Sequence, residues 1–379
     1  MELGSHYYAV LALCRFLGLK KDMAYKIAYS SQMVDDALIE RLIFKKKAKA
    51  VRFHIFNKQI GLDHCATCPK IMTIWSYNHA KMMRTLVPFH FVPSCLGNTY
   101  SRRIRTSLDS PILKKLIDSA LESKDPYHLG IILHVLGDAH AHQGFSGVVS
   151  RGNRIRKLRL DLDTISGKGD CFLAKLIARY PKLHSRTLAR ILPMYSHSRV
   201  GTLPDLPSAE WSYEYDIASK NPLPKFKATG PISNPKRYIQ AFQEFIELIQ
   251  KFIDLRPELE RDKIYDLQEV GFFDQLVKNI PRDEIGASWS EYLVKYGLFE
   301  KHDSRLIYDK HAWLRSAFKN YKTRMNAKTI PAKVIPVSNF ARSHWYQFYL
   351  AQREYKKTYD RLIAKCDLKR KTPSHRIKI

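Results

Sequence analysis

Apolar residues recur at helical spacing along most of this chain, and one stretch combines that spacing with candidate chemistry. The apolar run Leu129–Leu133 leads into His134-Val-Leu-Gly-Asp138-Ala-His-Ala-His142. Ser123-Lys-Asp-Pro126 before it is typical of a helix start, because proline is tolerated in the first turn. In a helix, residues four apart share one stripe. The pattern therefore predicts a helix with His134, Asp138 and His142 on one line.

The same periodicity predicts further helices on both sides of this stretch. The alternating residues 50–56 read as a strand or hairpin, which we place in an insertion over about residues 42–75. We therefore predict a mainly α fold, with a multi-helix core, a small β-hairpin insertion and an additional C-terminal helical region. The further helices are expected over residues 6–18, 23–34, 110–121, 170–180, 185–192, 235–254 and 338–366.

Prolines and glycines divide the chain into regions. Residues 216–235, with Asn221-Pro-Leu-Pro224 and Gly230-Pro-Ile-Ser-Asn-Pro235, are the best linker candidate. We predict a metal-binding helical domain over 1–215 and a helical region over 236–366, which either packs on the first domain as one unit or stands apart. The basic residues 367–379 read as a mobile tail.

The formal net charge of +28 over 379 residues is the most unusual bulk property. Such a charge destabilises a compact chain by self-repulsion, so it favours an anionic partner: nucleic acid, an acidic membrane surface or a phosphorylated substrate. A charged surface that serves only solubility is the alternative. Six cysteines without a disulfide-like spacing favour a reducing compartment. The lone Cys65-Ala-Thr-Cys68 pair is interpreted as incidental, not as a zinc knuckle or redox pair.

No signal-like segment opens the sequence, and no stretch is long and apolar enough to cross a bilayer. We therefore expect a cytoplasmic protein without a transmembrane segment, and signal-less secretion from a bacterium stays open. The oligomeric state is not predicted.

Two imidazoles and a carboxylate on one helix stripe suit a divalent metal such as zinc, iron or manganese. A hydrogen-bonded polar patch is the alternative. Asp35 and Asp36 end a predicted helix, where carboxylates oppose the helix dipole, so they are either functional or the start of a solvated loop. His197 and Asp205 lie on a loop restrained by Gly201 and the prolines that follow.

The order of these residues resembles the superfamily of zinc-dependent phospholipases C and S1/P1 nucleases. That resemblance rests on a histidine, an aspartate and a histidine in turn, then His-x-Leu-Gly-Asp and two later histidines. Several strings also resemble an uncharacterised bacterial family that we suspect to be a distant branch of that superfamily, over roughly residues 5–215. They are His6-Tyr-Tyr, Ser31-Gln-x-Val-Asp-Asp36, Phe89-His-Phe91, His142-Gln-Gly-Phe-Ser-Gly147 and Gly201-Thr-x-Pro-Asp-Leu-Pro207.

The resemblance implies a mostly helical protein that hydrolyses phosphodiesters at a zinc site. It implies that His90, His134 and Asp138 bind one metal and that Asp138 bridges to a second metal held by His6. His142 and His197 would help to hold another, with Asp205 as an acidic ligand. Asp36, or else Asp35, would orient or deprotonate the attacking water. The enzymes also use the amino terminus of the processed chain, usually a tryptophan, as a ligand. Because no tryptophan lies near the start of this chain, two or three metals both stay open.

These expectations lead to a metal-dependent phosphodiester hydrolase, phospholipase C-like or nuclease-like, that acts on a phospholipid or a nucleic acid. Arg151, Arg154 and Arg156 follow the central helix and are candidates for binding substrate phosphate, or else belong to a solvated loop. A metal-dependent phosphohydrolase of the HD type is one alternative. A non-catalytic basic module that binds nucleic acid or acidic lipid, with a structural metal site, is another.

Overall fold

The computed structural model describes residues 1–45, 54–56, 59–69, 78–153, 155–165, 197, 200–215, 231–323, 332–366 and 368. This part of the chain is mainly helical with a small strand content, as predicted. The α-helices are α1 (Val10–Phe16), α2 (Lys21–Asp36), α3 (His79–Arg84), α4 (Leu86–His90), α5 (Tyr100–Arg103), α6 (Pro111–Ser123), α7 (Pro126–Ala141), α11 (Asn234–Asp254), α12 (Phe272–Val277), α13 (Ile285–Lys295), α14 (Ala312–Ala317) and α16 (His344–Ile363).

Short helices and strands complete the described part. A π-helix, η1 (Gly4–Ala9), precedes α1, and the 3-10 turns are η3 (Arg151–Asn153), η4 (Leu162–Thr164), η7 (Leu203–Asp205), η9 (Ser304–Leu306) and η10 (Phe340–Arg342). The strands are β1 (Arg41–Phe44), β2 (His54–Phe56), β3 (Gln59–Asp63), β4 (Ile155–Leu160), β5 (Glu210–Tyr215), β6 (Ile232–Ser233) and β7 (Ala332–Val334).

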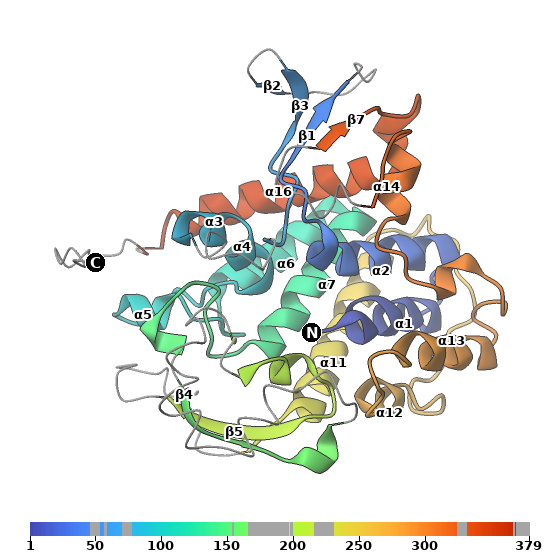
Figure 1. The fold of residues 1–379 in the computed structure, drawn as a ribbon. Coiled ribbons are helices and arrows are strands. Elements are labelled where there is room, and N and C mark those ends of the chain that lie inside the picture. Colours follow the sequence, from blue (N-terminus) through green and yellow to red (C-terminus); the bar gives the residue numbers. More distant parts are fainter. Residues whose placement is uncertain are drawn as a thin grey trace.

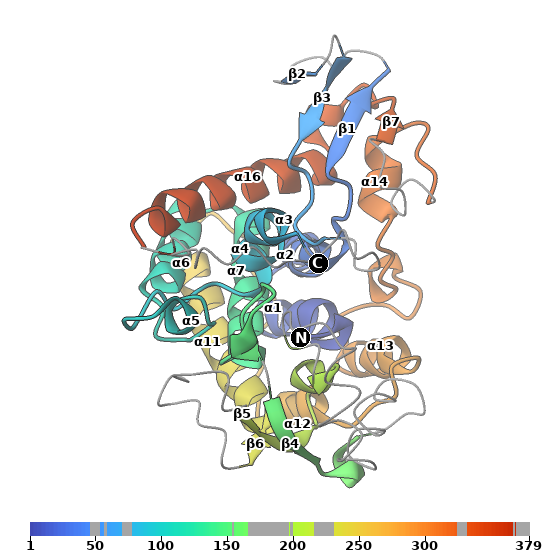
Figure 2. The same ribbon diagram turned by 60° about the vertical axis from the view of Figure 1, so that its left-hand side comes forward.

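Helix α7 runs through the middle of the molecule, with α1, α2, α6, α11 and α16 around it (Figures 1 and 2). Asp125 caps its first turn by accepting a hydrogen bond from the Tyr127 amide at 2.9 Å, and Pro126 occupies the first helical position. Every residue of α7 after Pro126 is buried. A helix that is apolar on all sides belongs inside a protein, so the polar groups that α7 carries lie in the interior.

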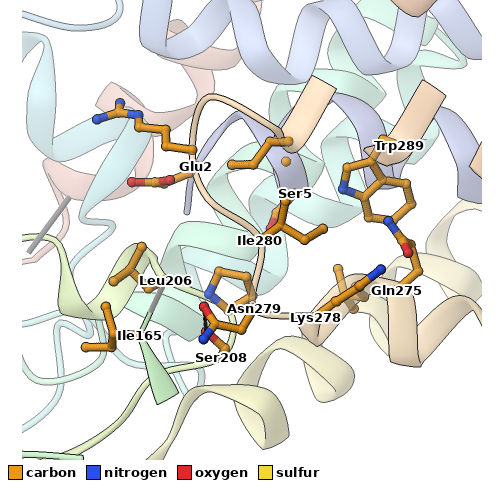
Figure 3. A pocket seen from close by; sticks show the side chains of 15 residues that line it. Glu2, Ser5, Ile165, Leu206, Ser208, Gln275, Lys278, Asn279, Ile280 and Trp289 are labelled. Carbon is orange, nitrogen blue, oxygen red and sulfur yellow. Dashed lines mark hydrogen bonds between the residues drawn. The ribbon is translucent and has the colours of Figure 1, made fainter. Parts of the chain in front are cut away.

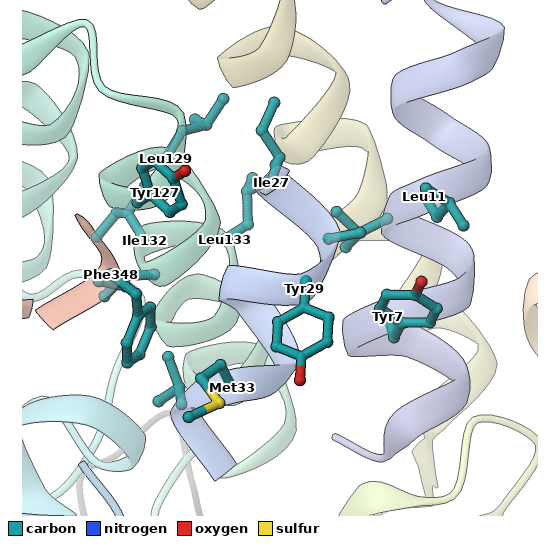
Figure 4. Close-up of a cluster of buried hydrophobic side chains, with 14 of the residues drawn as sticks. Tyr7, Leu11, Ile27, Tyr29, Met33, Tyr127, Leu129, Ile132, Leu133 and Phe348 are labelled. Carbon is teal, nitrogen blue, oxygen red and sulfur yellow. The ribbon is translucent and has the colours of Figure 1, made fainter. Parts of the chain in front are cut away.

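Glycine sets how closely α2 approaches α7. A Cβ added at Gly130 would stand 2.3 Å from the Ile27 carbonyl oxygen and 2.5 Å from the Ser30 Cβ, both on α2. Figure 4 shows the apolar side chains on either side of this contact, among them Ile27 and Met33 of α2 and Leu133 of α7. The absence of a side chain at position 130 therefore allows α2 to carry its C-terminal carboxylates close to α7.

The predicted insertion forms an antiparallel unit. β1 pairs with β3, β3 pairs with β2, and β7 adds a parallel strand from the C-terminal region, giving the order β2-β3-β1-β7. A second sheet, β4-β5-β6, lies at the opposite end of the molecule (Figure 1). The strand β6 lies within the segment 216–235 that the sequence predicts to be a linker, and residues 216–230 of that segment lie outside the described residues.

The C-terminal helices pack directly on the N-terminal ones. Aromatic residues of α11 and α16, such as Phe245 and Tyr355, share one hydrophobic cluster with Leu11 of α1 and Leu133 of α7. The domain boundaries themselves stay a prediction. The basic tail is outside the described residues except for position 368.

Some predicted helices differ in their limits from the observed ones, and two lie outside the described residues. The helix expected over 23–34 is α2, which begins two residues earlier, at Lys21, and ends at Asp36. The helix expected over 338–366 is divided, because η10 precedes an α16 that begins at His344 with the Ser343 hydroxyl as its cap. The helices expected over 170–180 and 185–192 lie outside the described residues. No helix of the described part has the length and apolar character needed to cross a membrane.

Candidate metal centre

Four separate elements bring histidine and aspartate side chains to the C-terminal half of α7. His134 and Asp138 are one turn apart on α7, His6 comes from η1, and His90 ends α4. Asp35 belongs to the last turn of α2. The side chains of these residues are buried except that of Asp35, which is one-third exposed. Buried ionisable groups need partners.

The carboxylate of Asp138 is the point on which three imidazoles converge. Its Oδ1 lies 3.1 Å from His6 Nε2, and its Oδ2 lies 3.0 Å from His90 Nδ1 and 3.2 Å from His134 Nε2. His134 Nε2 and His90 Nδ1 are themselves 3.1 Å apart. Nitrogen and oxygen atoms of the kinds that bind metals therefore surround one small volume. His6, His134 and Asp138 form one group of atoms close enough together to hold a metal ion.

Asp35 forms a second group with His90 and His134. Its Oδ1 lies 3.7 Å from His90 Nδ1 and 3.9 Å from His134 Nε2. Asp36 faces another way, because its Oδ2 accepts hydrogen bonds from the Tyr308 hydroxyl at 2.8 Å and from Gln32 at 3.3 Å. Of the two adjacent aspartates, Asp35 is the one that reaches the imidazoles.

His142, His197 and Asp205 form a third group. His142 is the residue that follows α7, so it continues the direction of the helix without belonging to it. Its Nε2 lies 2.9 Å from Asp205 Oδ1, and His197 Nε2 lies 3.5 Å from Asp205 Oδ2. The rings of the two histidines are stacked, with centroids 4.7 Å apart.

The other ring nitrogen of each histidine in this group has a backbone partner. His142 Nδ1 lies 3.0 Å from the His90 carbonyl oxygen, and His197 Nδ1 lies 2.8 Å from that of Gly201. A carbonyl oxygen can only accept, so each Nδ1 carries a proton, and in the neutral ring the lone pair is on Nε2. Both Nε2 atoms then face the Asp205 carboxylate, where the metal-free protein has a hydrogen bond between His142 and Asp205 and where a cation would instead take the Nε2 lone pairs. This is the orientation that backbone carbonyls give to metal-binding histidines.

The amino nitrogen of Met1 connects the groups. It is fully buried and lies 2.6 Å from Asp138 Oδ1 and 3.0 Å from Asp205 Oδ1. Burial alone would lower the pKa of this amine, but the negative charges of Asp138 and Asp205 raise it to about 11. No amino-terminal nitrogen of this chain was among the ligands predicted from the sequence. The resemblance offered an amino terminus as a ligand only for a processed chain that usually starts with tryptophan, so His6 was the residue near the start of this chain that was named as a candidate.

The electrostatics of the cluster suit cation binding. Burial lowers the pKa of His6 to about 4 and that of His134 well below its ordinary value, so both rings are neutral near pH 7. Burial would raise the pKa of Asp138, but the positive amine of Met1 and the neighbouring histidines hold it well below the usual range. Neutral imidazole and ionised carboxylate are the forms that bind metals.

His90 differs from the other two imidazoles. Burial would lower its pKa, yet hydrogen bonding to Asp138 and to Cys68 raises it well above the ordinary value. In the metal-free protein His90 therefore carries a proton beside Asp138, and binding of a cation would release it. Cys68, set aside in the sequence analysis as part of an incidental pair, thus lies against a candidate ligand.

The donor atoms fit a divalent cation. Each of the three groups offers imidazole nitrogen and carboxylate oxygen, which suits zinc and its neighbours among the transition metals. Inside a protein, lone pairs directed at one another at these distances are stabilised by a cation between them. The clusters could hold one to three ions, with His134 shared between two of the groups.

The arginines proposed to bind phosphate are not placed by the structure. Arg154 is outside the described residues, and for Arg151 in η3 and Arg156 in β4 only the backbone is described. The chain contains one His-Asp dipeptide, His302-Asp303, of the type found in HD phosphohydrolases. Asp303 forms an ion pair with Arg305 at 2.7 Å. Neither His302 nor Asp303 belongs to the three groups that could hold a metal.

A small pocket lies beside the centre, between the start of η1, the loop after η7 and the segment that joins α12 to α13 (Figure 3). Glu2 and Leu206 line it, and they directly follow Met1 and Asp205 in the chain. Its cavity volume of about 40 Å³ has room for only a few water molecules. The pocket as it stands is therefore too small for a lipid chain or a nucleobase.

Comparison with known proteins places the chain in a family without assigning it an activity. Neither the curated proteins nor the solved structures gave a match. A family model described as a family of unknown function, DUF6765, matches residues 1–363, a span that includes every side chain of the candidate centre. The chain therefore belongs to the family of unknown function DUF6765.

Proposed function

We propose that this protein is a metal-dependent phosphodiester hydrolase, as the resemblance to the zinc-dependent phospholipases C and S1/P1 nucleases implies. The observation that carries the proposal is the orientation of His142 and His197, whose protonated Nδ1 atoms bond to backbone carbonyls and whose Nε2 atoms face Asp205. Imidazoles with this orientation, together with the His/Asp cluster around Asp138, are suited to binding two or three divalent ions. Zinc is the metal that these ligands suit best.

The candidate ligands would bind ions on two sides of the Met1 nitrogen. His6, His90, His134 and Asp138 would hold ions on one side of the Met1 nitrogen, and His142, His197 and Asp205 on the other. Paired divalent ions supply a water of lowered pKa and stabilise the non-bridging and leaving oxygens of a phosphoester.

Asp35 is the best candidate for the general base. It is the most exposed carboxylate of the cluster, and its Oδ1 is close enough to His90 and His134 to meet a water held at the same place. A carboxylate in that position can orient the water and accept its proton. Asp36, the other candidate from the sequence, would act through Asp35 by fixing the end of α2, because its own oxygen is engaged by Tyr308.

The substrate is proposed to be a phosphodiester of a nucleic acid or a phospholipid. The net charge of +28 favours an anionic macromolecule. A nucleic acid substrate predicts binding that weakens steeply as salt rises. A phospholipid substrate predicts turnover that depends on a lipid surface.

The test is metal analysis of purified protein together with turnover of bis(p-nitrophenyl) phosphate, single-stranded DNA and phosphatidylcholine vesicles. The proposal expects bound zinc and turnover of at least one substrate, both lost in the double variant His134→Ala with Asp138→Ala. His140→Ala is the matched control, because His140 is on the same helix but bonds to Glu244 at 3.1 Å. Bound metal without turnover of any substrate would replace the hydrolase with a basic module that has a structural metal site.

A further inference from the structure

Arg105 is a buried cation on a segment that bonds to the loops after two candidate ligands, and no motif in the sequence singled it out. Its backbone lies between the loops that follow two candidate ligands. The Arg105 carbonyl accepts a hydrogen bond from the Ser94 amide at 2.7 Å, four residues after His90. The next residue, Thr106, exchanges hydrogen bonds with Gly144 and Phe145, just after His142. Arg105 is thus fixed to both ligand-bearing loops.

The guanidinium of Arg105 is fully buried and only partly satisfied. Its Nη2 donates to the Gly152 carbonyl oxygen at 2.7 Å, and its Cζ lies 4.3 Å from the centre of the Tyr215 ring. Within the described part of the chain, its Nε and Nη1 have no hydrogen-bond partner, and it forms no ion pair with a carboxylate. The Tyr215 ring offers a face for the cation but no full negative charge.

A buried charge that lacks a counter-charge is costly, and proteins normally pair it. The unpartnered Nε and Nη1 lie on different edges of the planar guanidinium, and each can donate to an oxygen of phosphate or carboxylate. Donors of this kind require an acceptor with negative charge. The side chain thus has the features of half of an ion pair.

A second unsatisfied donor is close by. The buried hydroxyl of Ser101 has no partner in the described residues. A Cβ added at Gly152 would stand 2.7 Å from Ser101 Oγ and 3.1 Å from Arg105 Nη2, so both groups are directed at the same glycine. A side chain at position 152 would clash with the hydroxyl, so glycine is what allows Ser101 and Arg105 to approach the same backbone segment.

We propose that Arg105 and Ser101 form a binding site for a tetrahedral oxyanion, either free phosphate or the phosphoryl group of an ester. The anion accepts hydrogen bonds from the guanidinium and from the Ser101 hydroxyl, and Tyr215 keeps the guanidinium in place from the other side. The site is formed by residues outside the three metal groups. It therefore goes beyond the proposed hydrolase and does not depend on it.

The experiment measures binding of inorganic phosphate to the purified full-length protein by titration calorimetry and by thermal unfolding. We expect one phosphate site that is weakened by about tenfold or more in Arg105→Gln, because a charge-assisted pair is lost. Arg237→Gln is the matched control, since Arg237 is also largely buried and donates to a backbone carbonyl, that of Ala141, at 3.2 Å. It should keep the site.

His134→Ala separates this site from phosphate bound at metal, because it removes a shared candidate ligand and leaves Arg105 intact. Retention of the Arg105-dependent site in His134→Ala is the expected result. A parallel titration with phenyl phosphate distinguishes the two sources of the anion. Binding of the ester assigns the site to a substrate phosphoryl group, and binding of phosphate alone assigns it to the free ion.

Thermal unfolding keeps the proposal falsifiable if Arg105→Gln is altered in stability. With an oxyanion site, phosphate raises the unfolding temperature of the wild type but not of Arg105→Gln, and Ser101→Ala shows a reduced shift. A purely structural arginine instead makes Arg105→Gln less stable by the same amount with and without phosphate. That result, or a phosphate site unaffected by Arg105→Gln, would overturn the proposal.

Discussion

Replacement of Asp138 by asparagine tests the electrostatic core of the metal centre with almost no change of shape. In the metal-free protein the carboxylate lies 2.6 Å from the Met1 amine and 3.0 Å from His90 Nδ1, and both of these nitrogens are positively charged. At an effective dielectric constant of about 20, a charge pair at 2.6 Å attracts by roughly 6 kcal/mol before desolvation is subtracted. Removing one partner of a buried pair typically costs about 3–5 kcal/mol.

We therefore expect Asp138→Asn to lose about 3–5 kcal/mol of unfolding free energy in the presence of a chelator, measured by urea denaturation. It should also be purified with less metal than the wild type, because an amide is a poorer ligand than a carboxylate. Asp360→Asn is the control: Asp360 is half exposed on α16, pairs with Lys356, and should change stability by about 1 kcal/mol or less. Equal stability and equal metal content in the wild type and in Asp138→Asn would show that the Asp138 carboxylate neither binds the metal nor stabilises the cluster.

Further predictions concern the packing of α7, the titration of His128 and the bound metal. Gly130→Ala should destabilise the protein by about 1–3 kcal/mol in urea denaturation, because its Cβ meets the Ile27 backbone oxygen. Gly137→Ala, on the same helix, should cost less, because its Cβ meets the ends of side chains and alanine favours the helix. Burial lowers the pKa of His128 to about 4, so this residue contributes stability above pH 6.5 that is lost as the pH falls toward 4. His128→Gln should reduce that loss by about 3 kcal/mol, and identical pH profiles of the two proteins would contradict the assignment. Chelation should lower the unfolding temperature, and added zinc should restore it, with a shift that grows with the logarithm of the free zinc concentration above the dissociation constant.

Several features of the fold were accessible from local sequence. Ser110 and Asp125 precede prolines at the starts of α6 and α7, and both act as caps as their side chains suggest. The insertion was recognisable because residues 50–56 alternate: β2 (His54–Phe56) lies in that stretch, and β1 and β3 lie in the predicted region of about 42–75 apart from Arg41. Such signals depend on neighbours in the chain and on hydrogen bonds within one element.

The centre was accessible from the sequence in part. His134 and Asp138 follow from helix geometry alone, and the remaining candidate ligands came from the order of motifs in a resemblance. Sequence spacing did not distinguish Asp35 from Asp36, because the choice depends on how the last turn of α2 faces α7 and Tyr308. The same limit applies to Met1 and Cys68, which reach the site across long separations in the chain.

By itself, the sequence determined a mainly helical chain, a basic surface and a histidine–aspartate stripe on an apolar helix, because these properties arise from composition and from periods of a few residues. Tertiary structure alone decided which atoms meet. The Nε2 atoms of His142 and His197 face Asp205 only because carbonyls of other loops hold their Nδ1 atoms. Arg105 became a candidate only when folding buried its charge away from any carboxylate of the described residues. Burial and orientation are properties of the packed chain, and no local pattern encodes them.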